Sequence, residues 1–191
     1  MPIVQLGDYH EGRERLARVD SSGALKSIPT EHSNIHHGYA FNFWHIETLV
    51  DDEVKYLHIS TGSLEVHLKE VDIQAEGEDT LVCFFHKLDV ALSATPEQRK
   101  VHNSNENSTR IPELKVYLNS TATGEEEDKC WRRWYLFGSE GVGQRSGSSA
   151  VGTNWEKVLA PNSDYILRFQ RPGKTGTFKV AIEARGYERA V

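Results

Sequence analysis

The sequence predicts an all-β protein, and three observations support that fold class. Apolar and polar residues alternate over many short segments, turn residues separate these segments, and helical periodicity is almost missing. Alternation with a period of two directs one set of side chains toward a core and the other toward water. About eight or nine such segments recur every 10 to 15 residues or so, which is typical of an antiparallel sandwich or barrel.

The composition fits one packed domain. Of the 191 residues, 38% are hydrophobic and 9% aromatic, so a sizeable core can be buried. The formal net charge is -6, from 22 Lys and Arg against 28 Asp and Glu. This balance argues against general nucleic-acid binding, which depends on neutralising phosphates. Two cysteines, Cys83 and Cys130, are too few for a disulfide framework.

Residues 1–30 differ from the rest of the chain. They carry few apolar side chains and are interrupted by four turn residues, Gly7, Gly12, Gly23 and Pro29. We expect an N-terminal arm over 1–30 that becomes ordered only against a neighbour, while a covering strand of the main domain is the alternative. Glu11–Val19 predicts a short helix with Leu16 and Val19 on one face. We find no pattern of a secretory signal or of a membrane span.

The main domain is expected over residues 31–191. Its first strands follow from three runs: Phe41, Phe43 and His45 alternating with Asn42, Trp44 and Ile46; Val54–Ile59; and Leu64, Val66 and Leu68 alternating with Glu65, His67 and Lys69. The continuous apolar run Leu81–Leu88 predicts a central strand covered on both faces. Cys83 within it is expected to be a small buried hydrophobe.

A long polar connection, Ala91–Arg110, follows, and Thr95–Gln98 within it predicts one helical turn. Two further strands are indicated by Leu114, Val116 and Leu118, and by Trp131, Arg133, Tyr135 and Phe137 alternating with Arg132, Trp134 and Leu136. An acidic loop, Glu125–Asp128, lies between them. The segment Gly138–Gly152, rich in Gly and Ser, predicts a flexible loop.

The C-terminal stretch Trp155–Tyr187 has the strongest strand pattern. Its inward sets are predicted to be Tyr165, Leu167 and Phe169, followed by Phe178, Val180, Ile182 and Ala184. Between the two runs, Arg171–Gly176 contains Pro and two Gly and indicates a reversal of the chain. The prediction is an antiparallel hairpin with one buried face.

Histidines suggest a metal site, but their spacing does not support one. His32, His36 and His37 lie close together in sequence, and His45, His58 and His67 lie on nearby strands. A zinc ion needs three or four converging ligands. In a strand, the adjacent His36 and His37 would point to opposite faces. A polar surface rich in histidine is the simpler interpretation, and it allows a response to pH.

No catalytic motif is present. The glycines of Gly141–Gly147 lack the Gly-Lys-Ser/Thr ending of a phosphate-binding loop, and no nucleophile elbow is found. Asp51 and Asp52, or the acids at Glu125–Asp128, suggest glycoside hydrolysis, but charged runs in loops are usually solvated. We therefore assign no catalytic, cofactor-binding or metal-binding residues.

Aromatic residues near Trp131 suggest a different activity, the binding of sugars or of a partner protein. Trp131, Trp134 and Tyr135 stand beside Arg132 and Arg133. Because alternation buries about half of such a strand, only Trp134 or the arginine pair is expected to face outward.

The order of motifs resembles a group of virion proteins of tailed bacteriophages, described as capsid decoration, cement or minor structural proteins. The resemblance covers residues 32–188. It rests on His32-Ser33-Asn34-Ile35-His36-His37-Gly38, Thr61-Gly62, the Asn- and Ser-rich Asn103–Ser108, the loop Gly138–Gly152, the strand start Leu159–Tyr165 and the final strand Ala181–Glu188. Glu125–Asp128 and the Arg132-Arg133 pair depart from the pattern, and the arm has no role in it.

The resemblance implies a jelly-roll-like antiparallel β-sandwich that binds the outside of a phage capsid and stabilises it without catalysis. It also implies the major capsid protein as partner, a homotrimer, no cofactor, no nucleic acid or membrane partner, and a place on the virion surface after synthesis in the host cytoplasm. A receptor- or glycan-binding module of a tail or head fibre is the alternative, suggested by the aromatic residues and by the long loops 91–110 and 138–152.

Overall fold

In a computed structural model, the chain divides into two units, Met1–Ser33 and Asn34–Val191. The second unit is described over residues 34–75, 97–122, 130–136, 156–173 and 175–189, with the backbone alone at 81–87 and 135–136. In the first unit, the backbone of four short strands is described: β1 (Asp8–His10), β2 (Arg13–Arg15), β3 (Arg18–Val19) and β4 (Leu25–Lys26).

The helix predicted at Glu11–Val19 is wrong. The segment contributes β2, which pairs antiparallel with β1, and β3, which pairs antiparallel with β4. Leu16 and Val19 supply too little apolar surface to stabilise so short a helix, which depends on packing of an amphipathic face. The expected role of residues 1–30 as an arm remains a prediction.

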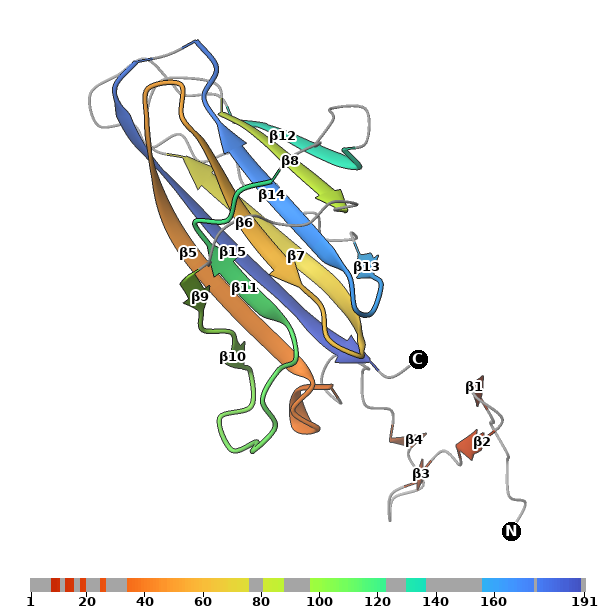
Figure 1. Ribbon diagram of the computed structural model, residues 1–191. Helices are drawn as coiled ribbons and strands as arrows, with labels where there is room; N and C mark the ends of the chain where they lie inside the picture. The colour runs from red at the N-terminus through yellow and green to blue at the C-terminus, as the bar shows by residue number, and fades with distance from the viewer. Residues whose placement is uncertain are drawn as a thin grey trace. The chain divides into compact units, whose positions relative to one another are not determined.

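The second unit is an antiparallel β-sandwich, as predicted (Figure 1). One sheet has five strands, in the order β10 (His102–Asn103), β5 (Ala40–Val50), β15 (Thr177–Arg189), β7 (Glu65–Ala75) and β13 (Lys157–Leu159). The other has six, in the order β12 (Arg132–Leu136), β8 (Leu81–Lys87), β14 (Asp164–Gln170), β6 (Val54–Ser60), β11 (Lys115–Leu118) and β9 (Glu97–Arg99).

Eight of the strands form four antiparallel pairs, and successive pairs along the chain lie alternately in the two sheets, like one long two-stranded ribbon folded over. β5 pairs with β15, β6 with β14, β7 with β13, and β8 with β12, all antiparallel. Members of the first and third pairs lie in the five-stranded sheet, and members of the second and fourth lie in the six-stranded sheet. The ribbon therefore changes sheets each time the chain reaches an end of the sandwich.

The predicted hairpin between β14 and β15 is wrong. β14 pairs with β6 and β8, whereas β15 pairs with β5 and β7, so the segment Arg171–Gly176 connects opposite sheets. Alternation shows which face of a strand is buried, but not which strand is its neighbour. Arg171 is buried at the start of this connection, with its guanidinium 4.8 Å from the centre of the Phe178 ring.

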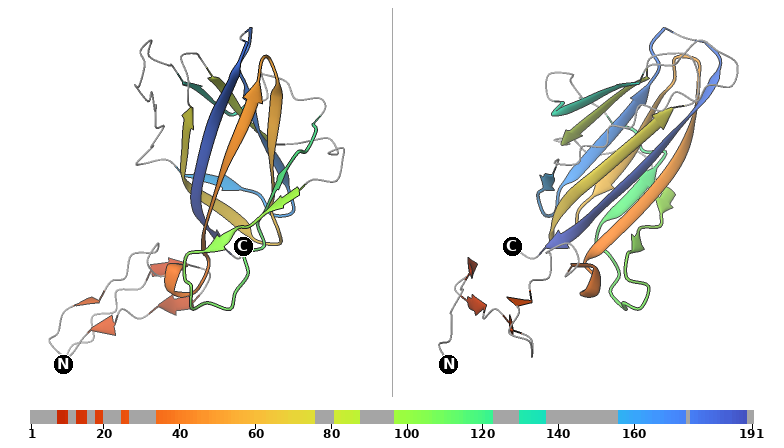
Figure 2. Two further views of the ribbon diagram at one scale, coloured as in Figure 1. Left: turned by 90° about the vertical axis from the view of Figure 1, so that its left-hand side faces the viewer. Right: turned by 180° about the vertical axis from the view of Figure 1, so that it is seen from behind.

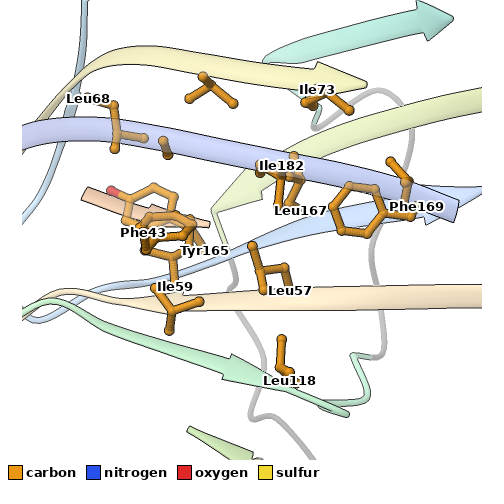
Figure 3. Close-up of a cluster of buried hydrophobic side chains, with 14 of the residues drawn as sticks. Phe43, Leu57, Ile59, Leu68, Ile73, Leu118, Tyr165, Leu167, Phe169 and Ile182 are labelled. Atoms are coloured by element: carbon orange, nitrogen blue, oxygen red, sulfur yellow. The ribbon is translucent and has the colours of Figure 1, made fainter. Parts of the chain in front are cut away.

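The predicted inward faces are confirmed. Figure 3 shows Leu57 and Ile59 of β6, Tyr165, Leu167 and Phe169 of β14, and Phe43, Leu68, Ile73, Leu118 and Ile182 in one apolar core. Phe178, Val180 and Ala184 are buried on the same side of β15 as Ile182. The predicted alternation of β5 also holds, because Phe41, Phe43 and His45 are buried and Trp44 and Ile46 are exposed.

A β-bulge changes which alternate residues of β7 face the core. Val66 and Leu68 face the core in its first half, and Val71 and Ile73 do so in its second half. Opposite this change, the register of β15 shifts between Arg185 and Gly186. A Cβ on Gly186 would lie 2.2 Å from the backbone oxygen of His67, so the two strands approach too closely for a side chain here.

Two smaller predictions need correction. Thr95–Gln98 does not begin a helical turn in its described part, because Glu97–Arg99 form strand β9 and pair with β11. Residues 34–36 form one helical turn, so His36 and His37 are not in a strand. β8 is an inner strand between β12 and β14, as predicted for Leu81–Leu88, whereas the side chain of Cys83 lies outside the described residues.

We expect Leu167→Ala to lower the free energy of unfolding by about 2–5 kcal/mol, because Leu167 is fully buried and its removal leaves a cavity. Urea titration monitored by circular dichroism measures this change. The control is Lys179→Ala at an exposed position of β15, for which the change should stay within about 0.5 kcal/mol. A cost below about 1 kcal/mol at Leu167 would contradict the assigned core.

Candidate functional site

Two sheet-crossing links meet at one end of the sandwich. We call them the first link pair: residues 51–53, between β5 and β6, and residues 171–176, between β14 and β15 (Figure 1). The amide of Gly176 donates to Asp51 Oδ1 at 2.8 Å, and the amide of Gly173 donates to Asp52 Oδ1 at 2.9 Å. Asp51 and Asp52, which suggested hydrolysis in the sequence, therefore hold the two links together.

A second link pair joins β6 to β7 and β13 to β14 at the opposite end. Thr61 Oγ1 donates to the carbonyl oxygens of Ala160 at 2.7 Å and Ser163 at 3.0 Å. The amide of Asn162, a residue with φ of 47°, donates to the carbonyl of Gly62 at 2.7 Å. The Thr61-Gly62 motif and the Leu159–Tyr165 motif are thus two sides of one hydrogen-bonded junction.

The Asn- and Ser-rich loop packs against the first residues of the second unit. Asn103 Nδ2 donates to the carbonyls of Gly38 at 2.8 Å and Arg110 at 3.0 Å. Asn105 Nδ2 donates to the carbonyl of His36 at 3.1 Å. Gly38 has φ of 72°, and a Cβ there would lie 2.1 Å from Ser108 Oγ, so both backbone conformation and space require glycine.

Glu188 lies buried beneath this loop. Its carboxylate accepts a hydrogen bond from the Leu114 amide at 2.7 Å and another from Arg110 Nη2 at 3.3 Å. Its own amide donates to the carbonyl of Tyr39 at 3.0 Å, and the Arg110 guanidinium lies 4.3 Å from the centre of the Tyr39 ring. Burial raises the pKa of Glu188, against the lowering effect of the Leu114 amide and Arg110.

The three strand histidines do not converge. His45 Nε2 lies 3.1 Å from Glu47 Oε2, His58 Nε2 lies 2.7 Å from Asp164 Oδ1, and His67 Nδ1 lies 2.7 Å from Glu156 Oε1. Each histidine is buried beside its own carboxylate, and His58 is in the opposite sheet from the others. Within the described residues, no group of three or more potential ligands could hold a metal ion, and His32 lies outside them.

The most polar group of side chains surrounds Glu156. Lys69 Nζ donates to Glu156 Oε2 at 2.8 Å, the Tyr187 hydroxyl donates to Oε1 at 3.0 Å, and His67 stacks on Tyr187 with ring centres 4.6 Å apart. Burial alone would raise the pKa of Glu156, but hydrogen bonds from Lys69, His67 and Tyr187 together lower it to about 2.

The pairing of His67 with the Glu156 carboxylate is similar to that of a general base with its orienting group. The second ring nitrogen of His67, Nε2, is buried and lies 3.6 Å from Glu65 Oε2. A general base must come within hydrogen-bond reach of the proton that it removes. Nε2 is buried, and the hydrogen bonds of Glu156 connect the residue before β13 with β7 and β15.

The aromatic group near Trp131 differs from its prediction. Trp134, expected to face outward, is only 4% exposed and belongs to the core, with the Arg132 guanidinium 5.1 Å from its ring centre. Trp131 is half-buried, with Lys157 Nζ 4.5 Å from its ring centre. Of the predicted outward residues, Arg133 is exposed. Of the two alternatives, the structure therefore excludes Trp134, and of the arginine pair Arg133 is exposed whereas Arg132 is half-buried.

The most exposed apolar row in the described residues lies on β5. Trp44 is 62% exposed, Ile46 52% and Val50 47%, and Thr48 between them is exposed too. All four are even-numbered residues of one strand, so they share the outer face of the five-stranded sheet. Exposed apolar residues that form a contiguous patch can mark a surface that binds other molecules. We call these four residues the β5 row and take them as the candidate binding surface.

Comparison of the chain with protein-family models, with curated proteins and with solved structures gave no match. Among the described residues, none of the helical segments has the length and apolar character needed to cross a membrane. The acidic loop Glu125–Asp128 and the loop Gly138–Gly152 lie outside the described residues.

We expect Glu188→Ala to destabilise the fold by about 1–3 kcal/mol, because the buried Leu114 amide would lose its acceptor. Glu188→Gln keeps an acceptor oxygen and removes the charge whose burial is unfavourable, so it should cost less. Urea titration of both variants at neutral pH measures the difference. Equal losses for the two variants would show that the hydrogen bond to Leu114 is unimportant.

Glu156 predicts a loss of stability in acid. Its pKa of about 2 in the fold is below the ordinary value of 4.5, so the unfolded chain takes up the proton first as pH falls. The stabilisation is complete above the unfolded pKa of 4.5 and is lost as pH falls toward about 2. Glu156→Gln should be less stable than the unmodified chain at neutral pH and should lose less across this window.

The measurement for Glu156 is the urea midpoint at several pH values between neutral and acidic conditions. The matched control is Glu97→Gln at an exposed position on β9, which should follow the unmodified chain. Parallel curves for Glu156→Gln and the unmodified chain would contradict the proposed hydrogen-bonded carboxylate.

Proposed function

We propose that this chain is a non-catalytic structural protein that binds the outside of a tailed-bacteriophage capsid and stabilises the shell. The observation that carries the proposal is that the motifs shared with this group of virion proteins form hydrogen bonds with one another within the fold. Thr61-Gly62 is joined to Leu159–Tyr165, and Gly38 to the Asn103–Ser108 loop, by hydrogen bonds within the protein. Motifs used in this way hold parts of the fold together, which is the role expected of them in a structural protein.

We also infer a jelly-roll path for the sandwich. In a jelly roll, eight antiparallel strands form two sheets by folding a long ribbon over itself. The pairs β5–β15, β6–β14, β7–β13 and β8–β12 follow such a ribbon, with β9, β10 and β11 added at the edges. Both link pairs connect neighbouring parts of the ribbon, which supports this interpretation.

The mechanism is binding by many equivalent copies. Decoration of a shell presents the same weak contact at many positions, and contacts that act together bind far more tightly than each alone. A protein that binds only the assembled shell stabilises it against disassembly. The major capsid protein is the proposed partner, the copies are proposed to assemble as a homotrimer, and no cofactor is required.

Binding of a receptor or glycan by a tail or head fibre is the second candidate. The aromatic residues that suggested it give it less support than expected, because Trp134 is buried and cations lie beside both Trp131 and Trp134. The exposed Trp44 is the remaining tryptophan that could stack on a sugar among the described residues. A glycan array separates this candidate from the first.

We expect the chain to co-purify with phage particles at a fixed, high copy number. Particles assembled without it should release their DNA at a lower temperature, and addition of the purified chain should restore the original release temperature. Quantitative mass spectrometry and a thermal release assay measure these outcomes. Absence from particles, or location on the tail together with a glycan-array hit, would contradict shell binding.

The N-terminal segment gives a separate prediction. Deletion of residues 1–30 should leave the second unit folded, because that unit begins at Asn34 and contains both sheets. Circular dichroism should retain the β signal, whereas binding to particles lacking the chain should weaken. Loss of the β signal would show that residues 1–30 cover the domain and do not act as an arm.

A further inference from the structure

Trp44 of the β5 row lies beside polar side chains on the outer face of the five-stranded sheet. In the strand register, Trp44 is opposite Glu183 of β15, and Glu183 is opposite Asp72 of β7. Arg185 and Glu70, two residues farther along the same two strands, are also opposite each other. The right-hand view of Figure 2 shows β5, β15 and β7 side by side. We call Trp44 and these polar residues the Trp44 patch.

The members of the Trp44 patch point away from the core. The residues next to Glu183 and Asp72 in sequence are core residues, and successive side chains of a strand point to opposite faces. Trp44 is 62% exposed, and the side chains of Arg185 and Glu183 are 57% and 46% exposed. Because opposite side chains on neighbouring strands have Cβ atoms about 5 Å apart, one ligand can reach both the indole ring and the polar groups.

The polar groups of the patch hold one another in place. Nε and Nη2 of Arg185 donate to Glu183 Oε1 at 2.9 and 2.7 Å. Nη1 of Arg185 lies 3.6 Å from Glu70 Oε2, which is too far for a direct hydrogen bond. Gln74 Nε2 donates to Asp72 Oδ2 at 2.8 Å. The groups are therefore ordered before a ligand arrives, which lowers the cost of binding.

These contacts leave hydrogen-bonding capacity unused at the surface. Within the described residues, no hydrogen bond reaches Glu183 Oε2 or Arg185 Nη1. The first atom is an acceptor and the second is a donor. A hydroxyl group donates and accepts at once, so it can bond to either atom and can bridge the 3.6 Å between Nη1 and Glu70 Oε2. The polar part of the patch therefore suits a ligand rich in hydroxyls.

The indole of Trp44 adds a flat apolar surface beside these groups. The face of an aromatic ring carries partial negative charge, so it attracts weakly positive C–H groups. A sugar ring presents C–H groups on its face and hydroxyls around its rim, and a saccharide therefore matches both parts of the patch. Two strand spacings, about 10 Å, separate Trp44 from Asp72, which leaves room for more than one sugar ring.

We propose that the Trp44 patch binds a neutral saccharide, with one sugar ring stacked on Trp44 and its hydroxyls bonded to Glu183 and Arg185. Charge disfavours an acidic saccharide, because the carboxylates of Glu70, Asp72 and Glu183 surround a single guanidinium. A cationic peptide fits less well than a saccharide, because it would compete with Arg185 for the carboxylates of Glu183 and Glu70.

Saccharide binding at this patch rests on the second candidate function, glycan binding, and does not require a shell. The patch lies on the face of a sheet and encloses little of a ligand, so a single site is expected to bind weakly. Several copies on one particle would bind a surface of repeated sugars far more tightly than one copy.

The first experiment titrates the full chain with neutral oligosaccharides of glucose, galactose, mannose and N-acetylglucosamine, and with acidic ones that contain sialic or galacturonic acid. The indole N–H signal of Trp44 in proton–nitrogen NMR spectra, assigned from its absence in Trp44→Phe, reports binding at the patch. We expect at least one neutral oligosaccharide to shift this signal with a dissociation constant in the millimolar range, and the acidic ones to bind more weakly.

The second experiment changes the patch and measures the dissociation constant of that neutral oligosaccharide by isothermal titration calorimetry. Trp44→Ala should raise the constant about tenfold or more, because the stacking surface is lost. Glu183→Gln should raise it by a smaller factor, because an amide replaces a charged acceptor. The matched controls are Val158→Ala, at an exposed apolar position on β13, and Glu97→Gln on β9, which should leave it unchanged. Circular dichroism checks that every variant folds.

No shift of the Trp44 signal by any neutral oligosaccharide, tighter binding of the acidic ones, or binding that Trp44→Ala leaves unchanged would each overturn the proposal. Trp44→Ala is also tested for binding to particles that lack the chain, and this binding should be retained. Its loss, together with no saccharide binding by the unmodified chain, would assign the patch to the shell instead. Absence of the unmodified chain from particles would contradict shell binding alone.

Discussion

The sandwich depends on hydrogen bonds between the links through which the paired strands pass from one sheet to the other. A link that leaves a sheet takes backbone groups away from their ladder partners, and these groups must find other acceptors and donors. Asp51 and Asp52 supply acceptors to Gly176 and Gly173 at one end, and Thr61 bonds to Ala160 and Ser163 at the other. The links of each pair therefore bond to each other and connect the two sheets at both ends of the sandwich.

Polar residues in the described part are mostly committed to this framework. Glu188 accepts hydrogen bonds from the Leu114 amide and Arg110, and Glu156 bonds to His67 and Lys69 of β7 and to Tyr187 of β15. The pKa of Glu188 is raised by burial, whereas that of Glu156 is lowered by its hydrogen bonds. Each shift follows from how completely the carboxylate is desolvated and how many donors reach it, so neither requires a catalytic role.

Alternation predicted the class of fold and most buried faces, because burial of one face imposes a period of two on any strand. It identified the inward sets of β14 and β15 and the alternation of β5 correctly. It could not distinguish a hairpin from a sheet-crossing link at Arg171–Gly176, because both begin with the same turn residues. It also left open whether Trp134 or the arginine pair faces outward, because the strand offers two alternating sets and each contains an aromatic residue.

The exposed β5 row was visible in the sequence only as half of an alternating pattern. Trp44 and Ile46 are as apolar as the residues of a core, so composition alone could not place them outside. Their exposure depends on which face of the five-stranded sheet packs against the other sheet, which is a property of the tertiary fold. The sequence also did not show that Asp51 and Asp52 accept hydrogen bonds from the link 171–176, because that link is distant in sequence and is brought close only by the fold.

The hydrogen bond from the Glu188 amide to the Tyr39 carbonyl places the first and last strands of the second unit side by side where the chain enters and leaves. Both chain ends of this unit therefore emerge close together, and a short connection would join them. The domain is thus suited to circular permutation, in which the present ends of the unit are joined and new ends are opened in an exposed loop. A fluorescent protein fused at residue 34 or at residue 189 would likewise sit over the same pole of the sandwich.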